Sequence, residues 1–274
     1  MALTTGIRRF AARHSAGYLL SHAGILGRIT RTELKARYAG TLLGPAWAVL
    51  GPLMLLGLYA VTYAMILKVQ VRGLDPTTYV LFIFAGLVPY LATSEALHQG
   101  VSAVVNSKAL LSNTVFPIDL APVKAVVLAQ VPMTVGMVMI LAGKAVFAGG
   151  LPATVFLLPC VWVLHAVALL GACWFLALFN VVFRDLRMIM AAALLALLII
   201  SPVAYTRDMV PPGLTFLVDL NPFAYFVIAY QKVLVLGQIP GPAEWAVMGT
   251  VAVVAFAAGG RFFATMKKVM VDHV

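Results

Sequence analysis

The sequence predicts an all-α membrane protein with six transmembrane helices, an N-terminal amphipathic interfacial helix and a re-entrant extracellular or periplasmic helical segment before the last span. Three observations lead to this fold class: a high apolar content, a low charge and several long apolar stretches. Of the 274 residues, 63% are hydrophobic and 10% are charged, whereas a soluble domain is about 45–50% apolar and about 25% charged. A water-soluble core cannot bury this much apolar surface, and a disordered chain has the opposite composition. The bilayer is therefore the expected solvent.

Six stretches are apolar enough to cross a bilayer, which takes about 20 mostly apolar residues. They are residues 46–67, 79–101, 121–142, 151–179, 188–205 and 243–264. A seventh apolar run, residues 223–236, is too short to span and follows Pro211, Pro212 and Pro222. We therefore expect residues 206–242 to form two short helices that dip into the outer leaflet and return, as a gate at the outer mouth. Residues 1–274 form a single membrane domain in this interpretation.

The distribution of basic residues predicts the orientation. Six spans place both termini on one side, and basic residues collect on the cytoplasmic side of membrane proteins. With cytoplasmic N and C termini, five of the 19 Lys and Arg residues fall outside, namely Lys68, Arg72, Lys144, Arg207 and Lys232. This asymmetry favours termini that both lie inside.

Residues 22–43 are predicted to form an amphipathic helix along the inner membrane surface. One face carries Arg28, Arg31 and Lys35 at i, i+3, i+7 spacing, which would direct these cations toward lipid phosphates. Glu33 and Arg37 are spaced for an ion pair within the helix. An apolar stripe runs through Ile25, Ile29, Ala36 and Leu43.

Two glycines, Gly40 and Gly44, follow this predicted surface helix. They fit either a close helix approach or a hinge before the first span.

A second amphipathic helix is predicted on the cytoplasmic side over residues 101–117. Its apolar stripe is interrupted by polar positions that include Asn106, Ser107 and Lys108, and Pro117 ends it. Such a helix can dock into a groove of a partner protein.

The sequence lacks the motifs of an ATP site and of common enzyme classes. Gly143-Lys144-Ala145 has neither the glycine five positions before Gly143 nor the hydroxyl residue that holds Mg²⁺ in a phosphate-binding loop. The five histidines have no metal-ligand spacing, and no nucleophile elbow or zinc-peptidase motif occurs. Cys160 and Cys173 are expected to be small packing residues. We therefore expect no metal or cofactor on this chain.

Two polar features near the cytoplasmic side each allow two interpretations. Glu95 and His98 lie toward the cytoplasmic end of the second span, where an ionisable group is a functional candidate. The alternative is an ion pair with a basic residue of the surface helix. Arg184 and Asp185 follow the fourth span and either receive an anionic head group or anchor and cap the turn.

An aromatic face on the first span also allows two interpretations. Tyr59 and Tyr63 are four residues apart and share one face of the helix. Aromatic faces stack on sugar C–H surfaces, so this face suits a pore through which a glycan slides, but ordinary packing or an interfacial aromatic belt is the alternative. Phe82 on the second span is a weaker candidate for the same lining.

Four motifs occur in order between about residues 28 and 236. They are Glu33-Leu-Lys-Ala-Arg-Tyr-Ala-Gly-Thr-Leu-Leu-Gly-Pro-Ala-Trp47, Asn113-Thr-Val-Phe-Pro117, Phe183-Arg-Asp-Leu186, and Pro202-Val-Ala-Tyr205 with Asn221-Pro222 downstream. The ordered set resembles the type-2 ABC (ABC-2) exporter permeases for polysaccharides, which serve the export of capsule, O-antigen and teichoic acid.

The resemblance implies a non-enzymatic permease subunit in the bacterial inner membrane that works as a homodimer. Two copies of a separate ABC ATPase would bind ATP and Mg²⁺, a lipid-linked polysaccharide would be the cargo, and periplasmic export proteins are further expected partners, whereas nucleic acid is not. The lipid head group would enter at Arg31, Lys35, Arg37, Tyr38 and Arg184. Tyr59, Tyr63 and Phe82 would line the channel. Coupling to the ATPase would use Asn106, Ser107, Lys108 and Leu111.

Two alternative functions stay open at this stage. An ABC-2 exporter of a small lipid or drug would have the same spans, but its ATPase would respond to lipophilic compounds rather than to glycan. A membrane-embedded lipid-processing enzyme would need polar groups that converge deep within the spans, and the sequence does not suggest such a set.

Overall fold

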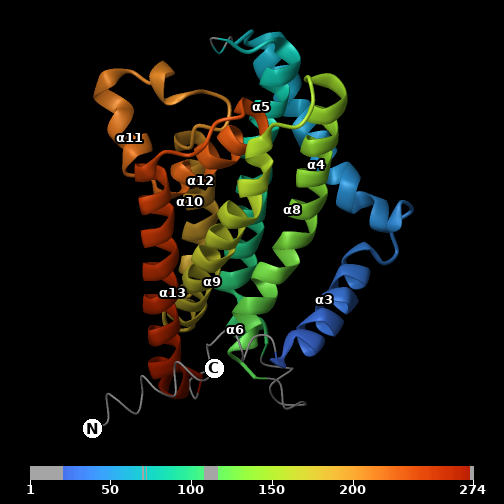
Figure 1. Ribbon diagram of the computed structural model, residues 1–274. Coiled ribbons are helices and arrows are strands. Elements are labelled where there is room, and N and C mark those ends of the chain that lie inside the picture. Colours follow the sequence, from blue (N-terminus) through green and yellow to red (C-terminus); the bar gives the residue numbers. More distant parts are fainter. Residues whose placement is uncertain (1–20, 70, 72, 108–116, 272–274) are drawn as a thin grey trace.

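The computed structural model describes residues 21–69, 71, 73–107 and 117–271, and every regular element in these ranges is helical (Figure 1). Each of the six predicted apolar stretches lies largely within a helix. In chain order, the α-helices are α3 (Ala23–Tyr38), α4 (Trp47–Ala60), α5 (Pro76–Val101), α6 (Ala103–Asn106), α8 (Leu120–Phe147), α9 (Leu158–Val182), α10 (Leu186–Ile200), α11 (Thr215–Asp219), α12 (Pro222–Gln231) and α13 (Pro242–Val271). π-Helical turns extend α4 over Val61–Ile66 and α12 over Lys232–Leu236.

Four helical stretches among the described residues are long and apolar enough to cross a membrane: Pro76–Val101, Leu120–Phe147, Ala153–Val182 and Pro242–Met266. A fifth candidate is the pair Pro212–Asp219 and Pro222–Leu236, which is bent by 91° and is either a broken span or a re-entrant segment. Val49–Tyr63 and Leu186–Ile200 are shorter apolar helices. The all-α membrane architecture is therefore present, with four or five candidate spans.

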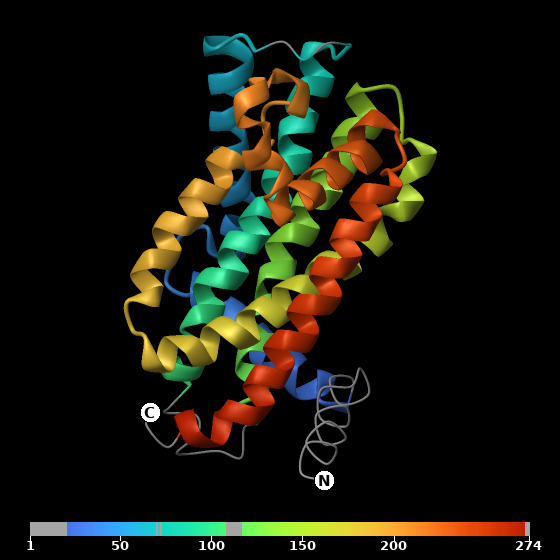
Figure 2. The same cartoon turned by 90° about the vertical axis from the view of Figure 1, so that its left-hand side faces the viewer.

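The helices form an elongated bundle that the chain traverses repeatedly (Figures 1 and 2). One end carries α6, the start of α8 and the last turns of α13, and the other end carries α11. We call these the α6 end and the α11 end. Helices α5, α9 and α13 run toward the α6 end, whereas α4, α8 and α10 run away from it.

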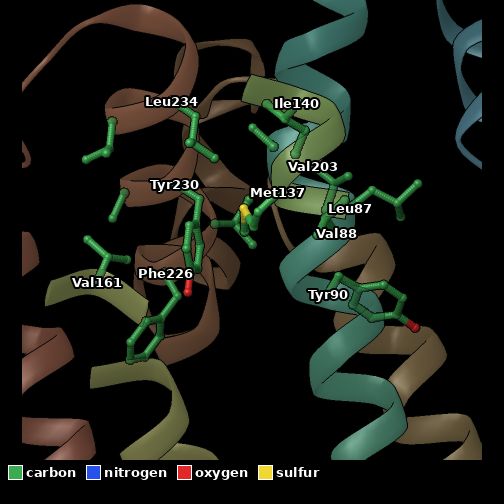
Figure 3. Packing of buried hydrophobic residues seen from close by; sticks show 14 of the residues in the cluster. Leu87, Val88, Tyr90, Met137, Ile140, Val161, Val203, Phe226, Tyr230 and Leu234 are labelled. Atoms are coloured by element: carbon green, nitrogen blue, oxygen red, sulfur yellow. The ribbon is translucent and has the colours of Figure 1, made fainter. Parts of the chain in front are cut away.

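Helix α5 is the centre of the bundle. It begins where Asp75 accepts hydrogen bonds from the backbone N–H groups of Thr77 and Thr78, both at 3.1 Å, and Pro76 fits the first helical position, where no N–H is needed. Its apolar side chains meet those of α8, α9 and α12 in the larger core cluster, part of which is drawn in Figure 3. The labelled members are Leu87, Val88, Tyr90, Met137, Ile140, Val161, Val203, Phe226, Tyr230 and Leu234.

The two short helices expected within residues 206–242 are α11 and α12. Asn221 sets the bend between them, because its Oδ1 accepts from the N–H of Phe223 at 3.0 Å and its Nδ2 donates to Ser201 Oγ at 2.9 Å. α12 then enters the core, where the Tyr230 hydroxyl lies 3.3 Å from Nδ1 of the buried His165. Gly237, with φ of 67°, reverses the chain toward α13.

Helices α9 and α13 cross at two glycines. A Cβ atom built on Gly259 would lie 1.9 Å from the carbonyl oxygen of Gly171, so the two backbones touch there as small-residue membrane contacts do. In the part of the chain that the structure describes, Gly40 and Gly44 have no such neighbour within 4 Å, and they adopt φ of 78° and 51°. They therefore act as a turn, which supports the hinge interpretation.

The cysteines differ in their environment. Cys173 is buried in the core, as expected of a packing residue, whereas Cys160 is exposed at the start of α9. The packing prediction for Cys160 is therefore wrong.

Candidate functional site

Helix α3 is held against the bundle by two ion pairs. Glu33 accepts from Lys124 of α8 at 2.6 Å, and Arg37 pairs with Glu95 of α5. Gln99, one turn further along α5, also donates to the Glu95 carboxylate. The intrahelical Glu33–Arg37 pair predicted from spacing is therefore wrong, and Glu95 takes the structural alternative of pairing with the surface helix.

The side of α3 that packs is also different from the predicted apolar stripe. Leu26 and Thr30 are the buried residues of this helix, and they lie on the same side as Glu33 and Arg37 at roughly i, i+4, i+7 and i+11. The predicted stripe is a separate face, on which Ile25 and Ile29 are half-buried and Ala36 is exposed, and its contact with the membrane surface stays a prediction. α3 ends at Tyr38 rather than at residue 43.

Arg37 is therefore committed to a protein carboxylate. Partial burial lowers the pKa of its guanidinium, but the hydrogen bond and the charge of Glu95 raise this pKa by more, so that the net pKa is raised. A permanently charged Arg37 beside Glu95 is suited to fixing α3. The prediction that Arg37 directly receives a head group is corrected in this respect.

The exposed face of α3 carries cations without a carboxylate partner among the described residues. Arg28, Arg31 and Lys35 are all exposed and have no ion pair in that part of the chain. Tyr38, at the last turn, is half-buried, and its carbonyl accepts from the Thr41 hydroxyl at 2.8 Å. The predicted face of Arg28, Arg31 and Lys35 thus forms, with Tyr38 at its end.

Arg184 lies in the exposed turn between α9 and α10 at the α6 end (Figure 2). Asp185 precedes α10 but makes no side-chain capping hydrogen bond, so the capping role considered for it is wrong. Arg187, in the first turn of α10, was not among the predicted site residues. It lines a polar cavity of about 360 Å³ together with Glu33, His98, Ser102, Asn106 and Lys124.

The segment predicted as a cytoplasmic helix over residues 101–117 is described in part. α5 ends at Val101, and α6 adds a single turn in which Val104 is buried and Asn106 is exposed. The Ser107 side chain is buried and donates to the carbonyl of Ala103 at 2.6 Å. Lys108 and Leu111 lie outside the described residues.

The three predicted lining residues fall into two groups. Tyr59 and Tyr63 are half-buried and stack with ring centroids 5.8 Å apart, so they form the shared aromatic face expected from their spacing. Phe82 is only 2% exposed and stacks on Tyr79 within the core of the subunit. Its assignment to a channel wall is therefore corrected to core packing.

Within the described ranges, no group of three His, Cys, Asp or Glu side chains is placed to hold a metal ion. The polar groups at the α6 end are instead arranged as ion pairs and hydrogen bonds between helices. Chemically, this arrangement can fix a surface helix and attract an anion to its exposed face.

Comparisons with known proteins give a consistent result. The profile of the family described as "ABC-2 type transporter" matches residues 26–235. The chain is 24% identical over 258 residues to the "O-antigen export system permease protein RfbA" of Myxococcus xanthus, a match that covers 93% of this chain and 97% of the relative. A protein of the same printed name from Klebsiella pneumoniae is 22% identical over 229 residues, covering 83% of this chain and 85% of the relative.

Proposed function

The chain belongs to the ABC-2 type transporter family, and from this membership we propose that it is the permease subunit of an ATP-driven exporter of a lipid-linked polysaccharide. The observation that carries the proposal is the match to an O-antigen export permease over 97% of that relative's length. The family profile matches residues 26–235, so the similarity extends over most of α3 and through α4 to α12. O-antigen-like glycan is the cargo class it supports best.

We propose that the subunit crosses the bacterial inner membrane six times. Four crossings are the long candidate spans, and α4 and α10 supply the first and fifth. α10 has 15 residues, about 22 Å at 1.5 Å per residue, so the buried stretch after it would complete the crossing of about 30 Å. The bent pair α11–α12 would then be re-entrant, and α3 and the end of α13 would share the cytoplasmic side. The basic residues support this orientation.

The entrance for the lipid head group is proposed at the exposed face of α3. Arg31 and Lys35, joined by Arg28, face away from the two ion pairs that hold the helix. Their charges suit a phosphate or pyrophosphate linker at the membrane surface. Tyr38 and Arg184 remain proposed contributors, whereas Arg37 acts by holding α3 in place.

The channel is proposed to form between two copies of the chain. α4 and α10 are the least covered of the proposed membrane-crossing helices, and Leu194 is the single buried residue of α10. Their exposed apolar side chains include Leu53, Met54, Leu58, Met188, Leu195 and Ile199. A second subunit could cover part of these faces, and Tyr59 and Tyr63 would offer aromatic surface to a sliding glycan.

Energy is proposed to come from two copies of a separate ABC ATPase, which would bind ATP and Mg²⁺. The exposed Asn106 and the segment that follows it would receive this partner. Because hydrolysis takes place on the partner, the chain itself needs only to transmit movement. Periplasmic export proteins would receive the glycan on the far side.

Deletion of the gene, followed by staining for polysaccharide, tests the proposal. We expect surface polysaccharide to disappear and lipid-linked glycan to accumulate inside the cell. Normal surface polysaccharide would contradict glycan export. Stimulation of the complex's ATPase by lipophilic compounds, with no response to glycan, would instead favour a small-lipid or drug exporter.

A further inference from the structure

Buried, non-helical backbone follows α10. Ser201 and Val203 are 0% and 2% exposed, and Pro202 between them cannot continue the helix because it lacks an N–H group. Carbonyl groups of such non-helical backbone have no helical partner, and at membrane depth they find no water and must be satisfied by the protein. The donors to these carbonyls therefore indicate which elements are joined to the end of α10.

One amide reaches two of these carbonyls. Nε2 of Gln231, at the end of α12, lies 2.9 Å from the Pro202 oxygen and 3.1 Å from the Val203 oxygen. It also lies 3.5 Å from the carbonyl oxygen of Phe82 in α5. Gln231 is 2% exposed, so this amide joins three segments in the interior.

Neighbouring contacts join the same three segments. The hydroxyl of Tyr79 in α5 donates to the Ala204 carbonyl at 2.8 Å, and Asn221 before α12 donates to Ser201 at 2.9 Å. Opposite the amide, α5 has Gly86. A Cβ there would lie 2.9 Å from Gln231 Nε2 and 3.1 Å from the Val203 Cα, so glycine leaves the room that the amide occupies.

We propose that Gln231 is a positioning residue that locks the re-entrant helix α12 to the broken end of α10 and to α5, so that these segments move as one unit during export. The inference rests on the proposed function. α5 is a 26-residue helix that carries this junction near one end and leads through Ser102 into α6 at the other. A displacement of the ATPase-coupling segment therefore reaches the outer gate along α5 and through this junction, in which the Gln231 amide is the group that contacts all three segments.

The amide chemistry makes the lock testable. Gln231→Leu keeps a similar volume but removes the donor, and Gly86→Ala moves a methyl group into the space of the amide. Gln130→Leu is the matched control, because Gln130 of α8 is a half-buried amide that accepts from Trp162 Nε1 at 2.7 Å, outside the junction. Each variant is purified as the complex with its ATPase and reconstituted with lipid-linked glycan.

The first readout is the amount of glycan transported per ATP hydrolysed. We expect Gln231→Leu to assemble and hydrolyse ATP but to transport about tenfold less glycan per ATP, the scale of losing one or two hydrogen bonds within a membrane. Gly86→Ala should act in the same direction, and the double variant should lose less than the product of the two single losses. Gln130→Leu should leave the ratio unchanged.

The second readout is independent of cargo. Hydrogen exchange of the detergent-purified complex should rise together in peptides covering residues 197–210 and 222–236 of Gln231→Leu, with α13 unchanged. The lock is overturned if these peptides exchange as in the wild type, if glycan per ATP is unaltered, or if hydrolysis, transport and assembly fall in equal proportion. The two proposals can fail separately. If the wild-type complex transports no glycan but exchange still rises in both peptides of Gln231→Leu, the export function is contradicted and the lock remains supported.

Discussion

A single added methyl group should separate two helices of this protein. Gly259 of α13 lies against the carbonyl of Gly171 in α9, and a Cβ on Gly259 would be 1.9 Å from that oxygen. Ordinary contact begins near 3.4 Å, so Gly259→Ala requires the helices to part by about 1.5 Å. The obstacle is backbone, which cannot rotate away as a flexible side chain could.

The cost of this separation follows from the packing it disturbs. Forcing a methyl group into a well-packed interior typically costs about 1–3 kcal/mol, and the absence of a yielding side chain places Gly259→Ala in the upper half of that range. A decrease of about 2 kcal/mol in the free energy of unfolding lowers the folded-to-unfolded ratio roughly 30-fold. The measurement is the midpoint of thermal unfolding of the detergent-purified protein, and unfolding is monitored as loss of the monodisperse protein peak.

Gly249→Ala is the matched control in the same helix. No atom of the described residues lies within 4 Å of a Cβ built on Gly249, and alanine is up to about 1 kcal/mol better than glycine within a helix. The control should therefore unfold at the wild-type temperature or slightly above it. Equal midpoints for Gly259→Ala and Gly249→Ala would refute the close crossing of α9 and α13.

Three further predictions concern the surface helix, the short helix α11 and the aromatic face. Arg37→Glu should place two carboxylates together and reduce surface polysaccharide when the variant is present in the membrane at the wild-type amount. Adding Glu95→Arg should restore surface polysaccharide, because it re-forms the ion pair with the charges exchanged. A failure to restore it would show that Arg37 has a role beyond its ion pair with Glu95. The pKa of Asp219 is lowered mainly by its hydrogen bond from Arg207, so the pair stabilises α11 above the ordinary aspartate pKa near 4, and this stability is lost as the pH falls through the lower folded-state value. The protection factor of α11, which is exchange corrected for the intrinsic pH dependence of amide exchange, should accordingly fall in acid, and Asp219→Asn should abolish that fall; identical pH profiles of the protection factor would contradict it. Phenylalanine at both Tyr59 and Tyr63 keeps the stacked rings and should leave glycan transport unchanged. Alanine at both positions removes about 0.5–1.5 kcal/mol of ring contact and should lower transport several-fold. Equal transport rates for the alanine and phenylalanine variants would show that these rings do not contact the glycan.

Hydropathy and proline placement made much of the fold predictable. The six apolar stretches became helices because apolar length is a local property, and Pro222 after Asn221 marked the start of α12 in the sequence itself. The all-α class and the bend within residues 206–242 were available for the same reason. Whether the shorter α4 and α10 cross the bilayer depends on packing against a partner and on the non-helical ends, which hydropathy does not report.

The polar contacts of the site could not be predicted in this way. Spacing favoured Arg37 with Glu33, but the bundle offers Glu95, 58 residues away along the chain, and Lys124 takes Glu33 instead. No period in the sequence encodes such pairs. The side of α3 that packs on the bundle is the side that carries these contacts.

Close approaches and buried donors were missed for a related reason. Gly40 and Gly44 have the familiar spacing within one segment, whereas Gly171 and Gly259 meet from two helices far apart in sequence. Gln231 is a polar residue within the apolar run of residues 223–236, and its partner, the carbonyl of Pro202, lies on another segment. A contact of this kind becomes visible only when both segments are placed.

The central claim is that this chain is a passive conduit driven by a separate ATPase. Uptake of labelled lipid-linked glycan into inverted membrane vesicles measures this directly. The vesicles contain the chain alone, the ATPase alone or both proteins, and the glycan is supplied on their outer, cytoplasmic face. We expect ATP-dependent uptake of glycan into vesicles that contain both proteins, and no ATP hydrolysis by the purified chain. Uptake without the chain, or ATP turnover by the chain in isolation, would contradict it.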